Sequence, residues 1–247
     1  AMIFALISFW GIYKTGNFVK TYEAAKLKII ALSAESGLII NEVLVVGQKK
    51  TEERILLQTL GVNRGFPIVA FDLNLAKTRV EALPWVLNAS IERVLPDSIF
   101  LTIKERKPLA LWQYGGRFSL IDDKGRVILT QGLEKYESFL IVVGADAPAH
   151  TMDLLSILKT EPDLFENVHA AIRIGNRRWD LRMKNGVSIQ LPEENPMMAW
   201  RRLANYQLSH SILERDLKLL DLRLPDRLII RQSLENKTDQ LMLGQET

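Results

Sequence analysis

The sequence predicts an α+β protein in which an N-terminal membrane helix, cut short at its beginning, precedes two folded domains. Helical apolar periodicity, strand-like alternation and intervening turn residues indicate this class. A length of 247 residues fits one large or two ordinary domains, and 47% hydrophobic residues can fill sizeable cores. We expect a membrane helix end and connector over 1–36, a first domain over 37–106, a second over 107–232 and a disordered tail over 233–247.

Residues 1–13 carry no charged side chain. As a helix they would reach only about 20 Å, less than the roughly 30 Å hydrocarbon core of a bilayer. Trp10 and Tyr13 stand just before Lys14, the order expected where a spanning helix leaves the membrane. The segment fits a membrane anchor, a signal-peptide hydrophobic region without its basic start, or a buried helix. We favour the anchor, with the residues Ile3, Phe4, Leu6, Ile7, Phe9, Trp10, Ile12 and Tyr13.

The first domain reads as strand, helix, helix, strand, strand. Residues 38–47 are rich in Leu, Ile and Val and predict the first strand. Thr51 and Asp72 are expected to cap the two helices, because their side-chain oxygens can accept free N–H groups of a first turn. Gly61 stands where a left-handed C-cap belongs, and the second helix is expected to end at Leu83, before a proline.

A hairpin completes this domain. Residues 87–92 and 99–104 alternate between apolar and polar side chains, as strands with one buried face do. Between them, the stretch 95–98 contains Pro and Asp, which favour a turn. Pro108 lacks a backbone N–H and is expected to close the second strand.

The second domain is predicted to be a mixed β domain in which two helices pack on an antiparallel-rich sheet. Asp-Asp-Lys-Gly at 122–125 and Asn-Gly at 185–186 are strong hairpin turns. Thr151 and Asn195 are expected to cap the two amphipathic helices. The last strand is expected over 228–231.

Composition excludes several kinds of chemistry. Without cysteine the chain can have no disulfide, thiol nucleophile or Cys-based zinc site. The formal net charge is only +3 and basic residues are scattered, which argues against a nucleic-acid partner. His150, His169 and His210 lie far apart in sequence, and no phosphate loop or nucleophile motif is present. The pair Arg201-Arg202 fits a solvated face or a contact with anionic lipid or an acidic partner. We therefore expect no catalytic residue, cofactor or metal.

Four stretches resemble the FtsQ/DivIB family of bacterial division proteins: 43–62, 83–112, 120–128, and 177–193 joined distantly to 217–231. The most specific is LPWVLNASIERVLPDSIFLTIKERKPLALW, in which the family motif is carried by Pro84, Trp85, Arg93, Pro96, Glu105, Pro108, Ala110 and Trp112. The resemblance implies a POTRA domain over 37–106 and an FtsQ-type β domain over 107–232. It also implies a single-pass protein of the bacterial inner membrane, with most of the chain in the periplasm at the division septum and no enzymatic activity.

The resemblance further implies a scaffold that recruits FtsB-like and FtsL-like membrane coiled-coil proteins, contacts other division proteins through the POTRA domain and helps control septal peptidoglycan synthesis. In the family, a partner strand adds to the edge formed by the last strand, and an unpaired edge can accept one. The corresponding residues are Leu224, Asp226, Arg227, Leu228, Ile229, Ile230 and Arg231. The enterobacterial version has different residues at 224, 226 and 227, and the arginines here could meet an acidic partner or only protect the edge from aggregation.

Two other hypotheses stay open at this point. An enzyme acting on the cell wall would need a cleft with converging carboxylates or a metal, which the sequence does not indicate. A POTRA-containing chaperone or transport-assembly module for secreted or outer-membrane substrates usually has tandem POTRA repeats or a following barrel, and the sequence suggests neither.

Overall fold

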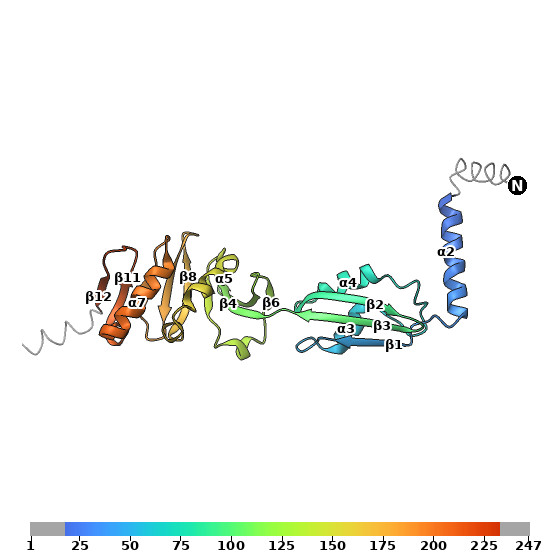
Figure 1. Cartoon of the computed structure of the whole chain (residues 1–247), viewed down its shortest axis with the longest axis horizontal. Coiled ribbons are helices and arrows are strands. Elements are labelled where there is room, and N and C mark those ends of the chain that lie inside the picture. The colour runs from blue at the N-terminus through green and yellow to red at the C-terminus, as the bar shows by residue number, and fades with distance from the viewer. Residues whose placement is uncertain (1–17, 233–247) are drawn as a thin grey trace, which may run out of the picture. The chain divides into compact units, whose positions relative to one another are not determined.

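The computed structural model describes residues 18–232, and the chain divides into two compact units, residues 1–106 and 107–247 (Figure 1). The expected anchor residues between Ile3 and Tyr13 and the expected tail over 233–247 lie outside the described residues. The first described element is helix α2 (Phe18–Glu35). Within 18–232 no helix combines the length and the hydrophobicity needed to cross a bilayer.

The first unit has the predicted β-α-α-β-β order. After α2, its elements are β1 (Glu42–Val46), α3 (Glu53–Leu60), α4 (Leu73–Glu81), β2 (Val86–Val94) and β3 (Ser98–Glu105). β3 lies in the centre of a three-stranded sheet, parallel to β1 and antiparallel to β2. The core forms where apolar side chains of both helices, such as Leu56 and Val80, meet alternate residues of the strands, such as Ile99 and Leu101.

Local signals predicted two of the four boundaries of α3 and α4 correctly, whereas α4 ends at Glu81 and not at the expected Leu83. Asp72 caps α4, and its carboxylate accepts the backbone N–H groups of Asn74 and Leu75, each at 3.0 Å. Gly61 has φ of 70° and ends α3 in the left-handed conformation. The expected Thr51 cap is wrong. α3 begins at Glu53 with Glu52 at the N-cap, and Thr51 belongs to the preceding loop, where its N–H donates to the Glu105 carboxylate at 2.7 Å.

The second unit is a mixed sheet with helices packed on it. Its elements, in chain order, are β4 (Pro108–Tyr114), β5 (Arg117–Asp122), β6 (Val127–Leu129), η1 (Leu133–Tyr136), β7 (Ile141–Val143), α5 (Ala147–Leu158), α6 (Pro162–Phe165), β8 (Val168–Ile174), β9 (Arg178–Met183), β10 (Ser188–Gln190), α7 (Pro196–His210), η2 (Ile212–Glu214), β11 (Leu217–Asp221) and β12 (Ile229–Gln232). The nine strands follow the order β12-β11-β10-β9-β8-β7-β4-β5-β6. Most neighbours are antiparallel, as predicted; the parallel pairs are β10–β11, β7–β8 and β4–β7.

Helices α5 and α7 and the sheet share one hydrophobic core. Its largest fully buried side chain is Trp200 of α7, whose indole N–H donates to the Leu158 carbonyl at the end of α5, at 3.1 Å. Because the indole N–H would be costly to bury unpaired, this bond fixes one helix against the other.

The sequence analysis missed strand β4 and misread Pro108. Pro108 was expected to close the second hairpin strand, but β3 already ends at Glu105 and Pro108 is the first residue of β4, which runs between β5 and β7. Ala110 and Leu111 are both buried, since this central strand is covered on both faces. A strand of that kind shows a continuous apolar run instead of alternation, which is why the pattern gave no signal.

The expected Thr151 cap is also wrong. Helix α5 begins four residues earlier, at Ala147, with Pro148 in its first turn. The hydroxyl of Thr151 is buried inside the helix and donates to the Ala147 carbonyl at 2.8 Å. The hydroxyl is thus satisfied within the helix and caps nothing. Asn195 does stand at the N-cap of α7, before Pro196, but its side chain forms no capping hydrogen bond.

Glu105, at the end of β3, binds the loop between β1 and α3 through hydrogen bonds. Its carboxylate accepts the backbone N–H groups of Lys49, Lys50 and Thr51, at 2.7–3.0 Å. Burial pushes the pKa of Glu105 upward, but these N–H donors outweigh burial and hold the pKa below its ordinary value. The ionised form therefore stabilises the folded first unit.

We expect Glu105→Gln to lower the free energy of unfolding of the first unit by about 2 kcal/mol at pH 7, since it removes a charged acceptor from three donors. Because the pKa of Glu105 is lower in the folded than in the unfolded state, its carboxylate stabilises the fold fully at pH values above the unfolded-state pKa. This stabilisation is lost as the pH falls through the folded-state pKa. The difference between wild type and variant should thus narrow below about pH 4. Hydrogen exchange of β1 and β3 amides measures both effects. Glu92→Gln, on an exposed part of β2, is the control.

Candidate functional site

Strand β12 forms one edge of the nine-stranded sheet (Figure 1). It pairs antiparallel with β11, in the register Ile229 with Asp221, Ile230 with Leu220 and Arg231 with Leu219. On its other side no strand lies beside it among residues 18–232. All four residues of β12 are exposed. A row of backbone N–H and C=O groups is therefore free to pair with another chain.

The edge offers an apolar side chain on each face of the sheet. Ile230 lies on the same face as its partner Leu220, which is buried in the core under α7, yet Ile230 itself is 44% exposed. Ile229 lies on the opposite face and is 47% exposed. Leu228, just before the strand, is half-buried against the core. An added strand could thus make apolar contacts on both faces as well as backbone hydrogen bonds.

The predicted site residues before the strand form a loop. Residues 224–228 precede β12 and are not part of a strand. Arg202 of α7 holds this loop: its guanidinium donates to the backbone carbonyls of Leu222, Leu224 and Pro225, the first two at 3.1 and 2.8 Å. The sequence analysis treated Arg202 as part of a solvated or partner-binding pair, because nothing local in the sequence shows that a helix residue reaches a later loop.

Ion pairs compensate several charges around the edge. Arg223 donates to both oxygens of Asp221, and these hydrogen bonds hold the pKa of that carboxyl below its ordinary value despite burial. On the loop, Arg227 donates to Asp226 at 2.9 Å, which likewise lowers the pKa of Asp226. Arg227 is therefore paired within the chain. Of the two arginines predicted to meet an acidic partner, Arg231 on the exposed strand stays available within the described region.

Most of the family-motif residues form hydrogen bonds that hold backbone segments in place. Arg93 donates to the carbonyls of Ile68 and Phe71, which ties β2 to the segment before α4. Trp112 donates its indole N–H to the Gly144 carbonyl at 2.8 Å. The carbonyls of Pro84 and Trp85 accept hydrogen bonds from Arg106. Pro96 follows a cis peptide bond in the β2–β3 turn, and Pro108 begins β4. Glu105 binds the loop between β1 and α3.

Comparisons with known proteins agree with this architecture. A family model for the FtsQ-type POTRA domain matches residues 38–106, and a model for the C-terminal domain of cell division protein FtsQ/DivIB matches residues 110–223. The protein "Cell division protein FtsQ" of Rhizobium meliloti is 36% identical over 200 residues, 81% of this chain and 65% of the relative. The FtsQ of Rhizobium radiobacter is 35% identical over 74% of this chain and 87% of the relative. This chain thus spans about two thirds of the R. meliloti relative's length.

A solved structure of the major extracytoplasmic domain of DivIB from Geobacillus stearothermophilus also aligns with the chain. The alignment covers 47% of this chain and 99% of that one, with a TM-score of 0.32 and 15% identity, too low a similarity to bear on the fold.

The two matched domains define a class: a bacterial cell division protein in which an FtsQ-type POTRA domain precedes a sheet-rich FtsQ/DivIB C-terminal domain. Within that class, the chain belongs to the FtsQ/DivIB family, and its curated relatives are mainly alphaproteobacterial FtsQ proteins.

Arg202 offers a direct test of how the edge is positioned. We expect Arg202→Gln to free the carbonyls of Leu222, Leu224 and Pro225 and to lower the hydrogen-exchange protection of the β11 and β12 amides by about 1.5–3 kcal/mol, the range for hydrogen bonds to charged groups. The neighbouring Arg201→Gln removes the same charge from an exposed position of the same helix and should leave protection unchanged. Equal effects of the two substitutions would contradict the role given to Arg202.

Proposed function

We propose that this chain is a non-enzymatic, membrane-anchored scaffold of bacterial cell division that binds its partners by β-strand addition at the β12 edge. One observation carries the proposal: β12 ends the sheet with no neighbouring strand among the described residues, while Ile229 and Ile230 stay about half exposed. An exposed apolar edge strand invites pairing with another chain, and this pairing is the interaction that we propose for β12.

An internal repeat in the sheet supports an antiparallel arrangement of the added strand. The segments β7–α5–β8–β9 and β10–α7–β11–β12 share the same strand directions: the first two strands are parallel and the third is antiparallel. In the first segment, β10 covers the free side of β9 and runs antiparallel to it. A partner strand beside β12 would occupy the equivalent position.

Family membership supports the identity of the partners. We infer that FtsB-like and FtsL-like membrane coiled-coil proteins bind the β12 edge and that other division proteins bind the POTRA domain. Through these contacts the protein helps control septal peptidoglycan synthesis. We also infer a single N-terminal membrane helix, which anchors the chain in the bacterial inner membrane with its two units in the periplasm at the septum. A POTRA match followed directly by an FtsQ/DivIB match favours this function over a chaperone for secreted substrates.

The test compares the two edges of one sheet. We expect Ile230→Glu to weaken binding of an FtsB-like partner by at least about tenfold, because it places a charge where an added strand would desolvate it. Val127→Glu is the matched control: Val127 belongs to β6, the strand at the other edge, and is 42% exposed, close to the 44% of Ile230. The measurement is a titration of the full chain with the purified partner, and circular dichroism checks the fold of each variant.

Two results would contradict the proposal. One is partner binding that Ile230→Glu leaves unchanged. The other is an equal loss caused by Val127→Glu, which would indicate a general effect on the sheet and not an edge-specific contact.

A further inference from the structure

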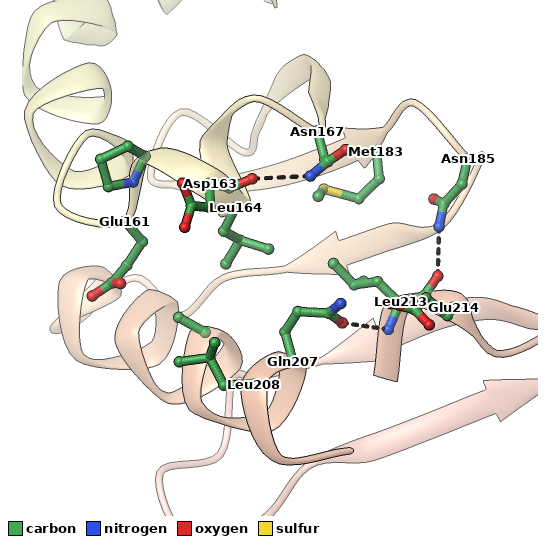
Figure 2. Close-up of a pocket in the computed structure, with 12 residues that line it drawn as sticks. Glu161, Asp163, Leu164, Asn167, Met183, Asn185, Gln207, Leu208, Leu213 and Glu214 are labelled. Carbon is green, nitrogen blue, oxygen red and sulfur yellow. Dashed lines mark hydrogen bonds between the residues drawn. The ribbon is translucent and has the colours of Figure 1, made fainter. Parts of the chain in front are cut away.

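A concave surface lies in the second unit, apart from the β12 edge. It is formed by α6, the end of β9, the last turns of α7 and η2 (Figure 2). It is a cavity of about 390 Å³. None of the residues predicted to bind a partner lines it. It is therefore distinct from the β12 edge, and the family motif gives it no role.

The floor of the cavity is apolar. Leu164, Met183 and Leu213 line it and are each less than 10% exposed, so the cavity opens directly onto the hydrophobic core. Leu208 of α7 stands at its rim and is 84% exposed, the highest value for a large apolar side chain in the described part of the chain. An exposed leucine beside an apolar hollow is costly in water and marks a contact surface.

Hydrogen bonds hold the cavity in shape. Asn185 donates to the Leu213 carbonyl at 2.7 Å, and Gln207 accepts the Leu213 N–H at 2.8 Å (Figure 2). Asn167 donates to the Asp163 carbonyl at 2.9 Å. Because these bonds join the β9–β10 turn, η2 and α7, a ligand would meet a surface that is already formed.

The charge around the cavity is negative. Glu161, Asp163 and Glu214 line it, no Lys, Arg or His does, and the described residues supply none of the three carboxylates with an ion-pair partner. The last two turns of α7 contribute Gln207 and Leu208, so the negative end of that helix dipole also points to this region. A cation beside the apolar floor would be favoured by both sources.

We propose that this cavity binds a protein segment in which a leucine-sized or larger apolar side chain is flanked by lysine or arginine. The apolar side chain enters the hollow between Leu208 and Leu213, and the basic residues meet the carboxylates at the rim. The cavity volume is large enough for one or two side chains. This surface is a second docking site, independent of strand addition at β12.

The probe is a fluorescent synthetic peptide with the sequence GKKLLKKG, titrated into the full chain and followed by anisotropy. We expect saturable binding that weakens as salt is added, since exposed charge pairs are screened. The triple variant Glu161→Gln, Asp163→Asn, Glu214→Gln should weaken binding by about tenfold. The variant Leu208→Ser, at an exposed position, should weaken it by a similar factor with no loss of thermal stability.

Two controls match these variants. The triple variant Asp123→Asn, Glu134→Gln, Glu137→Gln removes three exposed carboxylates of the same unit that do not line the cavity. Met198→Ser removes a 67% exposed apolar side chain elsewhere on α7. The proposal is overturned if the peptide does not bind at millimolar concentration, if a charge-inverted peptide GEELLEEG binds equally well, or if the control variants weaken binding as much as the cavity variants. Because Ile230→Glu should leave peptide binding intact, failure here stays distinguishable from failure of the β12 proposal.

Discussion

Main-chain hydrogen bonding across the nine-stranded sheet is the constraint on which the second unit depends. Each strand must pair its N–H and C=O groups with a neighbour or leave them to water, so the sheet can end only where an edge is solvated or is covered by a helix, a loop or another chain. Here β12 occupies one end, and α7 with its Trp200 contact to α5 supports the strands next to it. The properties of the candidate site follow from this position at the edge.

The side chains that fix this architecture mostly bind backbone groups. Glu105 collects three N–H groups of one loop, Arg93 and Arg202 each bind carbonyls of distant segments, and Trp112 binds the Gly144 carbonyl. A single charged or indole side chain can satisfy backbone groups that no secondary structure pairs. This explains how a motif without a nucleophile, base or metal ligand can still be the most specific part of the sequence.

Two surfaces of the second unit suit different partners. The β12 edge offers backbone groups with an isoleucine on each face, which suits an extended chain. The cavity beside α7 offers an apolar hollow with uncompensated carboxylates, which suits an anchored side chain with basic neighbours. The two proposed surfaces are separate, so binding at one leaves the other accessible.

The sequence by itself determined the class of fold, the order of elements in the first unit, the hairpin turns, and the caps at Asp72 and Gly61, because each depends on residues close together in the chain. It also placed the exposed strand near the C-terminal end, although that strand begins at Ile229 and not at Leu228. Only the tertiary structure decided four features: the start of α3, the central strand β4, the hydrogen bonds of Arg202 to the loop before β12, and the cavity. Near the start of α3, the Thr51 N–H donates to Glu105. Each of the four features joins residues that are distant in sequence or buried on both faces, and local periodicity contains no record of such contacts.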